Sequence, residues 1–255
     1  MAIELKRVDE FALITLSRPD ALNALSFELI RDLGRAFDAV AAGDARALLI
    51  TGAGSKAFCA GADIKELTGR SLAAQKSGAE LGQAVFAKLD RLPVPSVAVI
   101  SGYAFGGGLE LALACTFRLA TRNAKMGLPE IKLGLIPGYG GTQRLPRLAG
   151  EARALELILT GRTVGAEEAL RIGLVNRLLD GDALEQGVAF AREFSGYSLP
   201  VLALAREAVR RALDNPVHEG LKIEADLSTL AFQTRDAAEG MAAFIEKRKA
   251  RFGDH

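Results

Sequence analysis

The sequence predicts an α/β fold in which strands alternate with helices, followed by a tail made only of helices. Up to about residue 150, short apolar stretches with strand character alternate with longer stretches of helical periodicity. From residue 151 onward the strand signal nearly vanishes. We therefore expect a core over residues 1–195 that holds the functional site, and a helical assembly region over residues 196–255.

The first elements can be placed individually. Residues 3–7 and 11–17 alternate β-forming with polar residues around a charged turn, which is typical of a hairpin. Ser26 is a candidate helix N-cap, and apolar residues at helical spacing follow it up to Gly43. The other elements expected in this half are a strand at 45–51, a helix near 72–92 and a strand at 97–101.

The second half predicts one strand among helices. Residues 173–179 form its only β-like stretch. The helical stretches are 151–160, 166–172, 182–196, 200–214, 217–233 and 236–248.

Composition excludes several classes of protein. The formal net charge is +1, from 32 basic and 31 acidic residues, so no overall field would gather nucleic acid or an anionic membrane. Cys59 and Cys115 lie in no C-x-x-C pair, so we expect neither a disulfide nor a metal site. The N-terminus lacks a signal or transit pattern, and no apolar stretch approaches the roughly 20 residues of a membrane span. A cytoplasmic location is expected.

Three glycine-rich segments, at 51–63, 101–111 and 128–145, mark candidate ligand loops. None contains a P-loop or a dinucleotide fingerprint. The segment 101–111 leads from a strand through three glycines into a helix, so its amides should point at an anion. Small residues near 59–63 leave a second stretch of backbone bare, and two such amides could bind a developing oxyanion.

Glu110 and Glu130 are the candidate acid-base pair. Glu110 follows the glycines in an apolar stretch, where a carboxylate is costly to bury. A structural alternative is a first-turn carboxylate that interacts with the helix dipole. Glu130 follows Pro129 in the third loop, and its alternative is an ordinary surface glutamate. Two carboxylates in neighbouring loops suit reversible proton transfer.

Several segments together resemble the crotonase, or enoyl-CoA hydratase/isomerase, superfamily. The resemblance covers nearly the whole chain, with the motifs in the family's order. The segments are RPDALNAL at 18–25, AFCAGADIKEL at 57–67, GYAFGGGLEL at 102–111, LPEIKLGLIPGYGGTQRLPRLAG at 128–150, TGRTVGAEEALRIGLVNRL at 160–178 and EGMAAFIEKRKARF at 239–252.

The resemblance implies a spiral of ββα repeats and a C-terminal helical region that builds homotrimers, commonly paired into hexamers. It implies Glu110 and Glu130 as catalytic residues, the amides of Ala60 and Gly107 as the oxyanion hole, and Gly138 as the residue that positions water. It further implies an acyl-CoA substrate, with coenzyme A as part of that substrate and no separate cofactor. The residues expected to line the coenzyme A and substrate site are Leu22, Lys56, Ala60, Gly61, Ala62, Asp63, Ile64, Phe244 and Lys247.

Because both glutamates are present, the sequence favours an enoyl-CoA hydratase, which adds water across a 2-trans double bond to give a 3-hydroxyacyl-CoA, in fatty-acid or related degradation. A Δ3,Δ2-enoyl-CoA isomerase that uses Glu130 alone is the alternative. An RNA-binding relative without catalysis is a third hypothesis, but it predicts a basic stripe that the balanced charge does not provide. The length of the acyl chain and the pathway stay open.

Overall fold

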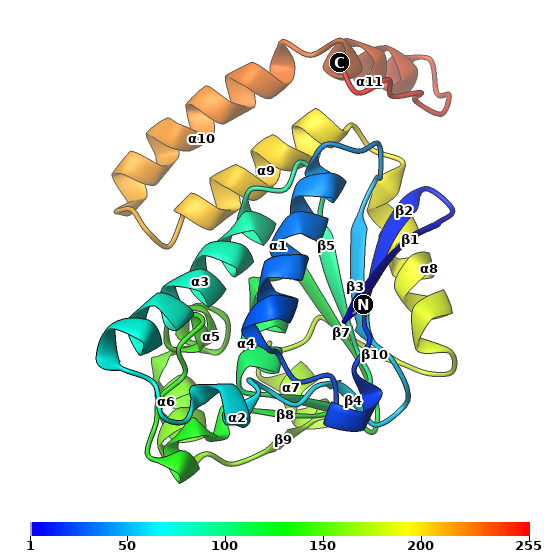
Figure 1. Ribbon diagram of the computed structural model, residues 1–255. Coiled ribbons are helices and arrows are strands. Elements are labelled where there is room, and N and C mark those ends of the chain that lie inside the picture. Colours follow the sequence, from blue (N-terminus) through cyan, green and yellow to red (C-terminus); the bar gives the residue numbers. More distant parts are fainter. Residues whose placement is uncertain (1) are drawn as a thin grey trace.

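The computed structural model describes residues 2–255 and confirms the α/β fold class (Figure 1). Its strands form a six-stranded sheet, ordered β1-β2-β3-β5-β7-β10, and a four-stranded sheet, ordered β4-β6-β8-β9. The strands are β1 (Ile3–Val8), β2 (Phe11–Leu16), β3 (Leu48–Gly52), β4 (Ala57–Cys59), β5 (Ser96–Ile100), β6 (Tyr103–Phe105), β7 (Phe117–Thr121), β8 (Lys125–Gly127), β9 (Val164–Gly165) and β10 (Arg177–Leu179).

The helices lie around and beyond these sheets. The α-helices are α1 (Phe27–Ala41), α2 (Ile64–Leu67), α3 (Leu72–Asp90), α4 (Gly107–Ala114), α5 (Gly141–Ala149), α6 (Glu151–Thr160), α7 (Ala166–Arg171), α8 (Ala183–Ser195), α9 (Leu199–Arg211), α10 (Val217–Phe232) and α11 (Arg235–Ile245). Two short 3-10 helices are η1 (Pro19–Ala21) and η2 (Pro129–Leu133).

Consecutive strands alternate between the two sheets. Strands β3, β5 and β7 enter the large sheet, and the strand that follows each of them, β4, β6 or β8, enters the small one. Neighbours from β2 to β10 in the large sheet are parallel, as are β4, β6 and β8. The chain therefore winds through both sheets once per repeat, which is the spiral that the resemblance implied.

The large sheet is covered on both faces. Alternate residues of β2 and β3, such as Ile14 and Ile50, face a core shared with α1, α3 and α4, whereas Leu13 and Leu49 face α8. Because both faces are buried, these parallel strands are almost continuously apolar. The loops that leave the strands on the α4 side carry the glycine-rich segments.

Most expected elements are present near their expected bounds. Ser26 caps α1 by accepting a hydrogen bond from the Leu29 N–H at 3.1 Å. The sequence analysis missed β4 and β6–β9, of which all but β7 have two or three residues and are too short to show a periodic pattern. β7 contains the buried Arg118, whose guanidinium donates to the carbonyls of Leu174 and Cys115.

The last three helices bury little of their apolar surface within this chain. Neither α9 nor α10 contains a buried residue, although they are 13 and 16 residues long. Figure 1 shows α10 and α11 at one end of the molecule, beyond α9. Large apolar side chains exposed on α9 to α11 and their connections are Val209, Leu213, Val217, Leu221, Leu230, Phe232, Met241, Phe244 and Ile245.

The expected boundary at residue 195 coincides with the end of α8. Arg46 bridges this point, because it donates to the carbonyls of Ser195 and Tyr197 and pairs with Asp254 at 2.5 Å. Arg206 of α9 donates to the Leu92 carbonyl at 3.0 Å. Charged side chains thus attach the helical tail to the core. No helix described by the structure is long and apolar enough to cross a membrane.

Asn23 joins two of the loops that carry the site. It is fully buried with φ of +58°, and its amide donates to the carbonyls of Ala53 at 3.0 Å and Ala57 at 2.8 Å. Its side-chain oxygen accepts from the Arg18 N–H at 3.0 Å. Asparagine tolerates the left-handed region better than most residues, and its side chain satisfies three backbone groups here.

We expect Asn23→Ala to lower the free energy of unfolding by about 3 kcal/mol, because it leaves buried groups unpaired and places alanine in a left-handed conformation. Urea unfolding at a fixed protein concentration measures this. Asn123→Ala, in an exposed turn, is the matched control and should change stability by less than ~0.5 kcal/mol. Equal midpoints for the two variants would contradict the role of Asn23.

Candidate active site

The first turn of α4 brings the glycine-rich loops together. Gly106 has φ of +50° and ψ of −128°, a conformation that essentially only glycine adopts. A β-carbon on Gly106 would lie 2.8 Å from Glu130 Oε1 and 3.7 Å from the Gly61 Cα. One on Gly108 would lie 2.2 Å from the Cys59 carbonyl oxygen. All three loops therefore meet at this helix N-terminus, as the sequence predicted.

The pair of oxyanion donors needs a correction. Ala60 was expected to offer its amide, but that N–H donates to the Leu22 carbonyl at 3.0 Å and is already engaged. Two residues later, the Ala62 N–H has no hydrogen-bond partner among residues 2–255. Its neighbours pair with Leu25 instead, because Leu25 donates to the Gly61 carbonyl and accepts from the Asp63 N–H, both at 2.8 Å. The extended pairing with Leu25 leaves the Ala62 amide free.

Gly107 provides the second free amide. It is the first residue of α4, so its N–H has no partner within the helix. The contact between Gly61 and Gly106 places the loop that holds Ala62 against the loop that holds Gly107. Ala62 and Gly107 therefore offer one unpaired amide from each of two adjoining loops, and the helix dipole favours negative charge at the N-terminus of α4.

Glu110 is buried and held by two backbone amides. Its side chain lies within the apolar helix α4 and the residue is 2% exposed. One carboxylate oxygen, Oε1, accepts from the N–H groups of Tyr139 at 2.7 Å and Gly141 at 2.8 Å. The second oxygen accepts no hydrogen bond from residues 2–255. A carboxylate fixed in this way has one oxygen left for a ligand.

Glu130 faces the same space from η2. Its Oε1 lies over Gly106, where only a residue without a side chain leaves room. Its Oε2 is buried and has no hydrogen-bond partner in the part of the chain that the structure describes. An unpartnered buried carboxyl oxygen is costly, so this oxygen is available to exchange a hydrogen bond with a ligand.

Both carboxyl groups hold protons more tightly than ordinary glutamates do. Burial, chiefly, raises the pKa of Glu110 to about 7, the Glu130 charge raises it as well, and the Gly141 and Tyr139 amides oppose the rise. Burial also raises the pKa of Glu130. Proton exchange near neutral pH requires groups tuned in this direction.

The other residues expected to line the cleft lie near these loops. Lys56 is exposed and Ile64 is 47% exposed, so both can contact a ligand, and Leu22 is half-buried. Asp63 is already used, because one oxygen caps α2 at Lys65 and the other pairs with Arg18 at 3.0 Å. Its position in the cleft is therefore explained without a ligand.

The structure does not bring Phe244 and Lys247 to this site within one chain. Phe244 lies on α11 with 85% of its surface exposed, and Lys247 follows with φ of +55°. Figure 1 shows α11 at the end of the molecule opposite α2 and β4. The expected role of these two residues at an adjacent subunit's site stays a prediction.

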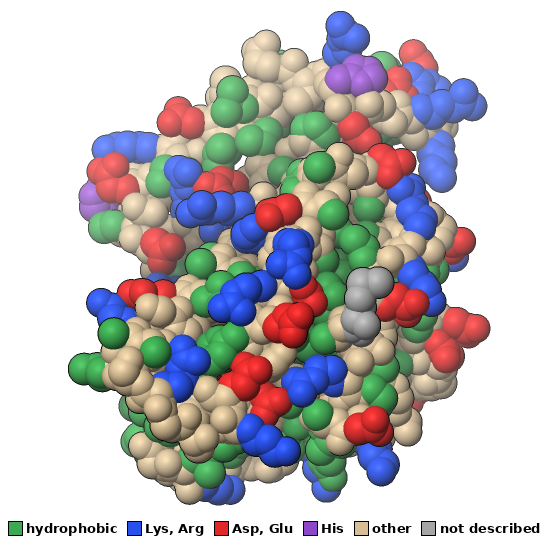
Figure 2. Space-filling model, in the orientation of Figure 1, with side chains coloured by type: hydrophobic (Ala, Val, Ile, Leu, Met, Phe, Trp, Pro, Cys, Tyr) green, Lys and Arg blue, Asp and Glu red, His purple; other side chains and the backbone are tan. Residues whose placement is uncertain are grey.

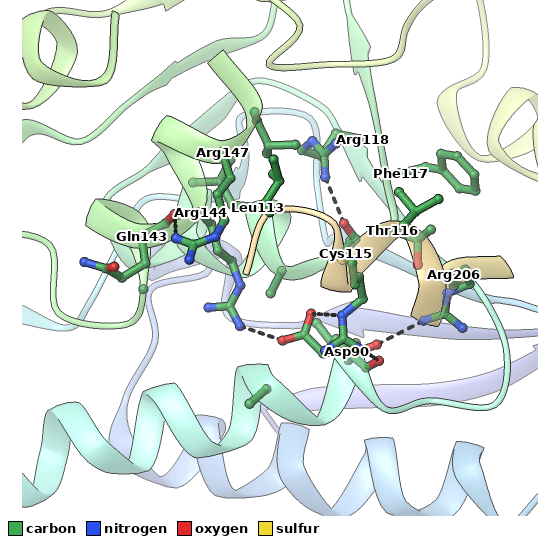
Figure 3. A pocket seen from close by; sticks show the side chains of 18 of the residues that line it. Asp90, Leu113, Cys115, Thr116, Phe117, Arg118, Gln143, Arg144, Arg147 and Arg206 are labelled. Atoms are coloured by element: carbon green, nitrogen blue, oxygen red, sulfur yellow. Dashed lines mark hydrogen bonds and ion pairs between the residues drawn. The ribbon is translucent and has the colours of Figure 1, made fainter. Parts of the chain in front are cut away.

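A cavity of about 1040 Å³ is lined by residues of α3, α4, α5 and α9 and of their connections (Figure 3). Gly138 and Gly140 line it, whereas neither glutamate does. Arg144 crosses it to pair with Asp90 at 3.0 Å and donates to the Tyr139 carbonyl at 3.4 Å. Arg144 of α5 thus connects Asp90 of α3 with the Tyr139 backbone. Residues 2–255 bring together no group of three His, Cys, Asp or Glu side chains that could hold a metal ion.

Sequence reasoning missed the groups that hold the glutamates. Tyr139 and Gly141 act through backbone N–H groups, which a sequence does not identify. The one indication of their role was the set of glycines at 138, 140 and 141. Ala62 was missed because the register of its loop against Leu25 cannot be read from a sequence pattern. The Gly138 N–H, which was expected to position water, has no partner among the described residues, and the Gly138 carbonyl accepts from Gln83 at 2.9 Å.

Comparison with known proteins places the chain among enzymes of one kind. A relative from Rhizobium meliloti (strain 1021), named probable enoyl-CoA hydratase, is 46% identical over 94% of this chain and 93% of its own. The crotonyl-CoA hydratase of Syntrophomonas wolfei is 41% identical over 98% and 97%. The crystal structure of an enoyl-CoA hydratase from Bacillus anthracis superposes with a TM-score of 0.95 at 36% identity, covering 100% of both chains.

The sequence model of the enoyl-CoA hydratase/isomerase family matches residues 7–255. This match extends over both sheets, the three loops and the helical tail. The chain belongs to the enoyl-CoA hydratase/isomerase family.

Proposed function

We propose that this protein is a hydro-lyase that adds water across the 2-trans double bond of enoyl-CoA thioesters. The observation that carries the proposal is the joint geometry of Glu110 and Glu130 beside two free amides. The relatives named enoyl-CoA hydratase and crotonyl-CoA hydratase support it. A protein that only bound RNA would not need a buried glutamate beside a second, half-buried one, and the face seen in Figure 2 mixes basic and acidic side chains without a basic stripe.

The free amides supply the electrophilic side of the reaction. The N–H groups of Ala62 and Gly107 donate to the thioester carbonyl oxygen, which gains negative charge when water attacks C3. The electrons of the double bond move towards this oxygen and give an enolate. Donors already oriented before the reaction need no rearrangement, and each such donor is commonly worth ~10²–10³-fold in rate.

The glutamates supply the proton transfers. Glu110 in its ionised form takes a proton from water, because the two amides on its Oε1 stabilise negative charge there. Water forms its bond to C3, and Glu130 in its protonated form donates to C2. Proton exchange with solvent returns both groups to their starting states. We assign the unpaired Gly138 N–H to the attacking water, as a donor to its oxygen.

The same chemistry assigns the Lys56 ammonium to the anionic coenzyme A portion, since Lys56 forms no ion pair among residues 2–255.

We also propose that the chain assembles as a homotrimer or a dimer of such trimers. The support is the apolar surface that α9 to α11 leave uncovered. Assembly would bring Phe244 and Lys247 to a neighbouring subunit's site.

Light scattering should therefore give a mass of three or six times 27.0 kDa. The exposed apolar helices need a partner surface to bury them. Replacing Leu221 and Phe232 by glutamine should lower this mass, whereas Lys222→Gln, on the same helix, should not. A fully active single chain at micromolar concentration would contradict the assembly.

Glu110→Gln and Glu130→Gln should each lower kcat for hydration of crotonyl-CoA by at least ~10²-fold, the usual worth of a positioned acid or base. Binding of the thioester should persist, because the oxyanion donors are unchanged. Hydroxyacyl-CoA formation and conversion of 3-enoyl to 2-enoyl thioester are measured for both variants. Near-normal hydration by Glu110→Gln would contradict the mechanism and favour an isomerase that uses Glu130 alone.

Glu110→Gln should also be more stable than the parent at pH 8. In the folded state the Glu110 pKa is about 7, above its ordinary 4.5, so ionisation costs stability as pH rises from 4.5 through 7. Above pH 7 the neutral amide avoids this cost, which amounts to roughly 1–3 kcal/mol, whereas near pH 4 the gain should vanish. Urea unfolding at both pH values tests this. A less stable variant at pH 8 would show that Glu110 is a structural helix-terminus carboxylate.

A further inference from the structure

The ring of Tyr139 lies directly beside the proposed reaction centre. The Tyr139 N–H is bonded to Glu110 Oε1, and the side chain is buried between α3 and α4 with only 7% of the residue exposed. A β-carbon on Gly107 would lie 3.1 Å from the ring. The ring therefore packs against Gly107, whose amide is proposed to bind the thioester oxygen. It belongs to the same residue whose N–H is bonded to Glu110, the proposed base.

Helix α3 is shaped around this ring. A β-carbon on Gly82 would lie 2.2 Å from Tyr139 Cδ1, which no real side chain could accommodate. One turn further along, Phe86 meets the ring edge-on, with centroids 5.8 Å apart and planes at 81°. The hydroxyl makes no hydrogen bond within residues 2–255. Packing of the ring, rather than a bond to its oxygen, explains why tyrosine fits here.

The packing of aromatic rings against glycines of α3 continues one helical turn before Gly82. A β-carbon on Gly78 would lie 2.6 Å from the Phe27 ring and 3.3 Å from a guanidinium nitrogen of Arg70. Arg70 stacks over Phe27 at 4.2 Å from its centroid. The inner face of α3 is therefore filled by side chains at both of its glycines.

A thioester bound by Ala62 and Gly107 has its C3 beside Glu110, so the rest of the acyl chain must continue past the Glu110 carboxylate. The Tyr139 ring lies against Gly107, and the Tyr139 N–H is bonded to Glu110. The cavity of about 1040 Å³ offers no continuation, because neither Tyr139 nor Glu110 is among the residues that line it.

We propose that the Tyr139 ring closes the acyl end of the substrate site and restricts the enzyme to short enoyl thioesters. This inference rests on the proposed hydratase function. It makes Tyr139 a specificity-determining residue that takes no part in proton transfer. The Tyr139 N–H keeps its role in holding Glu110 whatever the side chain is.

The test compares the parent with Tyr139→Ala and Tyr139→Phe on crotonyl-, 2-hexenoyl-, 2-octenoyl- and 2-decenoyl-CoA. One misfitting methylene can cost ~10-fold or more in kcat/KM, so the parent should prefer crotonyl-CoA to 2-decenoyl-CoA by at least ~10²-fold. Tyr139→Ala should narrow this ratio by at least ~10-fold, chiefly by improving the longest substrate. Tyr139→Phe is the matched control and should keep the parent's ratio, because it keeps the ring.

Inhibition by decanoyl-CoA, which has no double bond to hydrate, supplies a second readout that does not depend on Glu110 being well placed. It should bind Tyr139→Ala at least ~10-fold more tightly than the parent or Tyr139→Phe. A parent that hydrates 2-decenoyl-CoA as well as crotonyl-CoA, or equal inhibition of all three proteins, would overturn the inference. A parent that hydrates no enoyl thioester would instead overturn the proposed function, and the binding comparison would still test the role of the Tyr139 ring.

Discussion

Two backbone hydrogen bonds to one oxygen of Glu110 tie the site to the fold. The donors are Tyr139, in the loop before α5, and Gly141, the first residue of α5, whereas the acceptor lies in α4. A carboxylate buried in an apolar helix is tolerated only when such donors are in place. Arg144 of α5 donates to the Tyr139 carbonyl and pairs with Asp90 of α3, so α3, α4 and α5 must all be packed before the carboxylate is satisfied.

The two glutamates are held in different ways. Glu110 is held by two backbone N–H groups, which suits the role of base proposed for it, because the charged form is then stabilised in one place. Glu130 has a buried oxygen without a partner and is held mainly by the shape of its loop around Gly106. The two groups come from elements that the spiral places side by side, although 20 residues separate them along the chain.

The long, periodic elements could be predicted from sequence, because α1, α3 and α8 each bury one face against the sheets. The glycine-rich loops and both glutamates could also be found, since a carboxylate among apolar residues and a run of glycines are unusual locally. The free donor could not be identified as Ala62, because which amide stays unpaired depends on how its loop pairs with Leu25, a contact between distant segments. The position of the Tyr139 ring could not be predicted either, because it depends on the space that Gly82 leaves on the distant helix α3.

The helix that carries Glu110 also has a thiol near each end. Cys59 packs against the first turn so closely that a β-carbon on Gly108 would clash with it. Cys115 is the C-cap residue, and its thiol donates to the Leu111 carbonyl at 3.6 Å. Burial raises the pKa of both thiols to about 12, so the folded protein keeps them protonated and unreactive. Their reaction with a thiol reagent therefore requires local opening, and it reports separately on each end of one helix during native-state fluctuation.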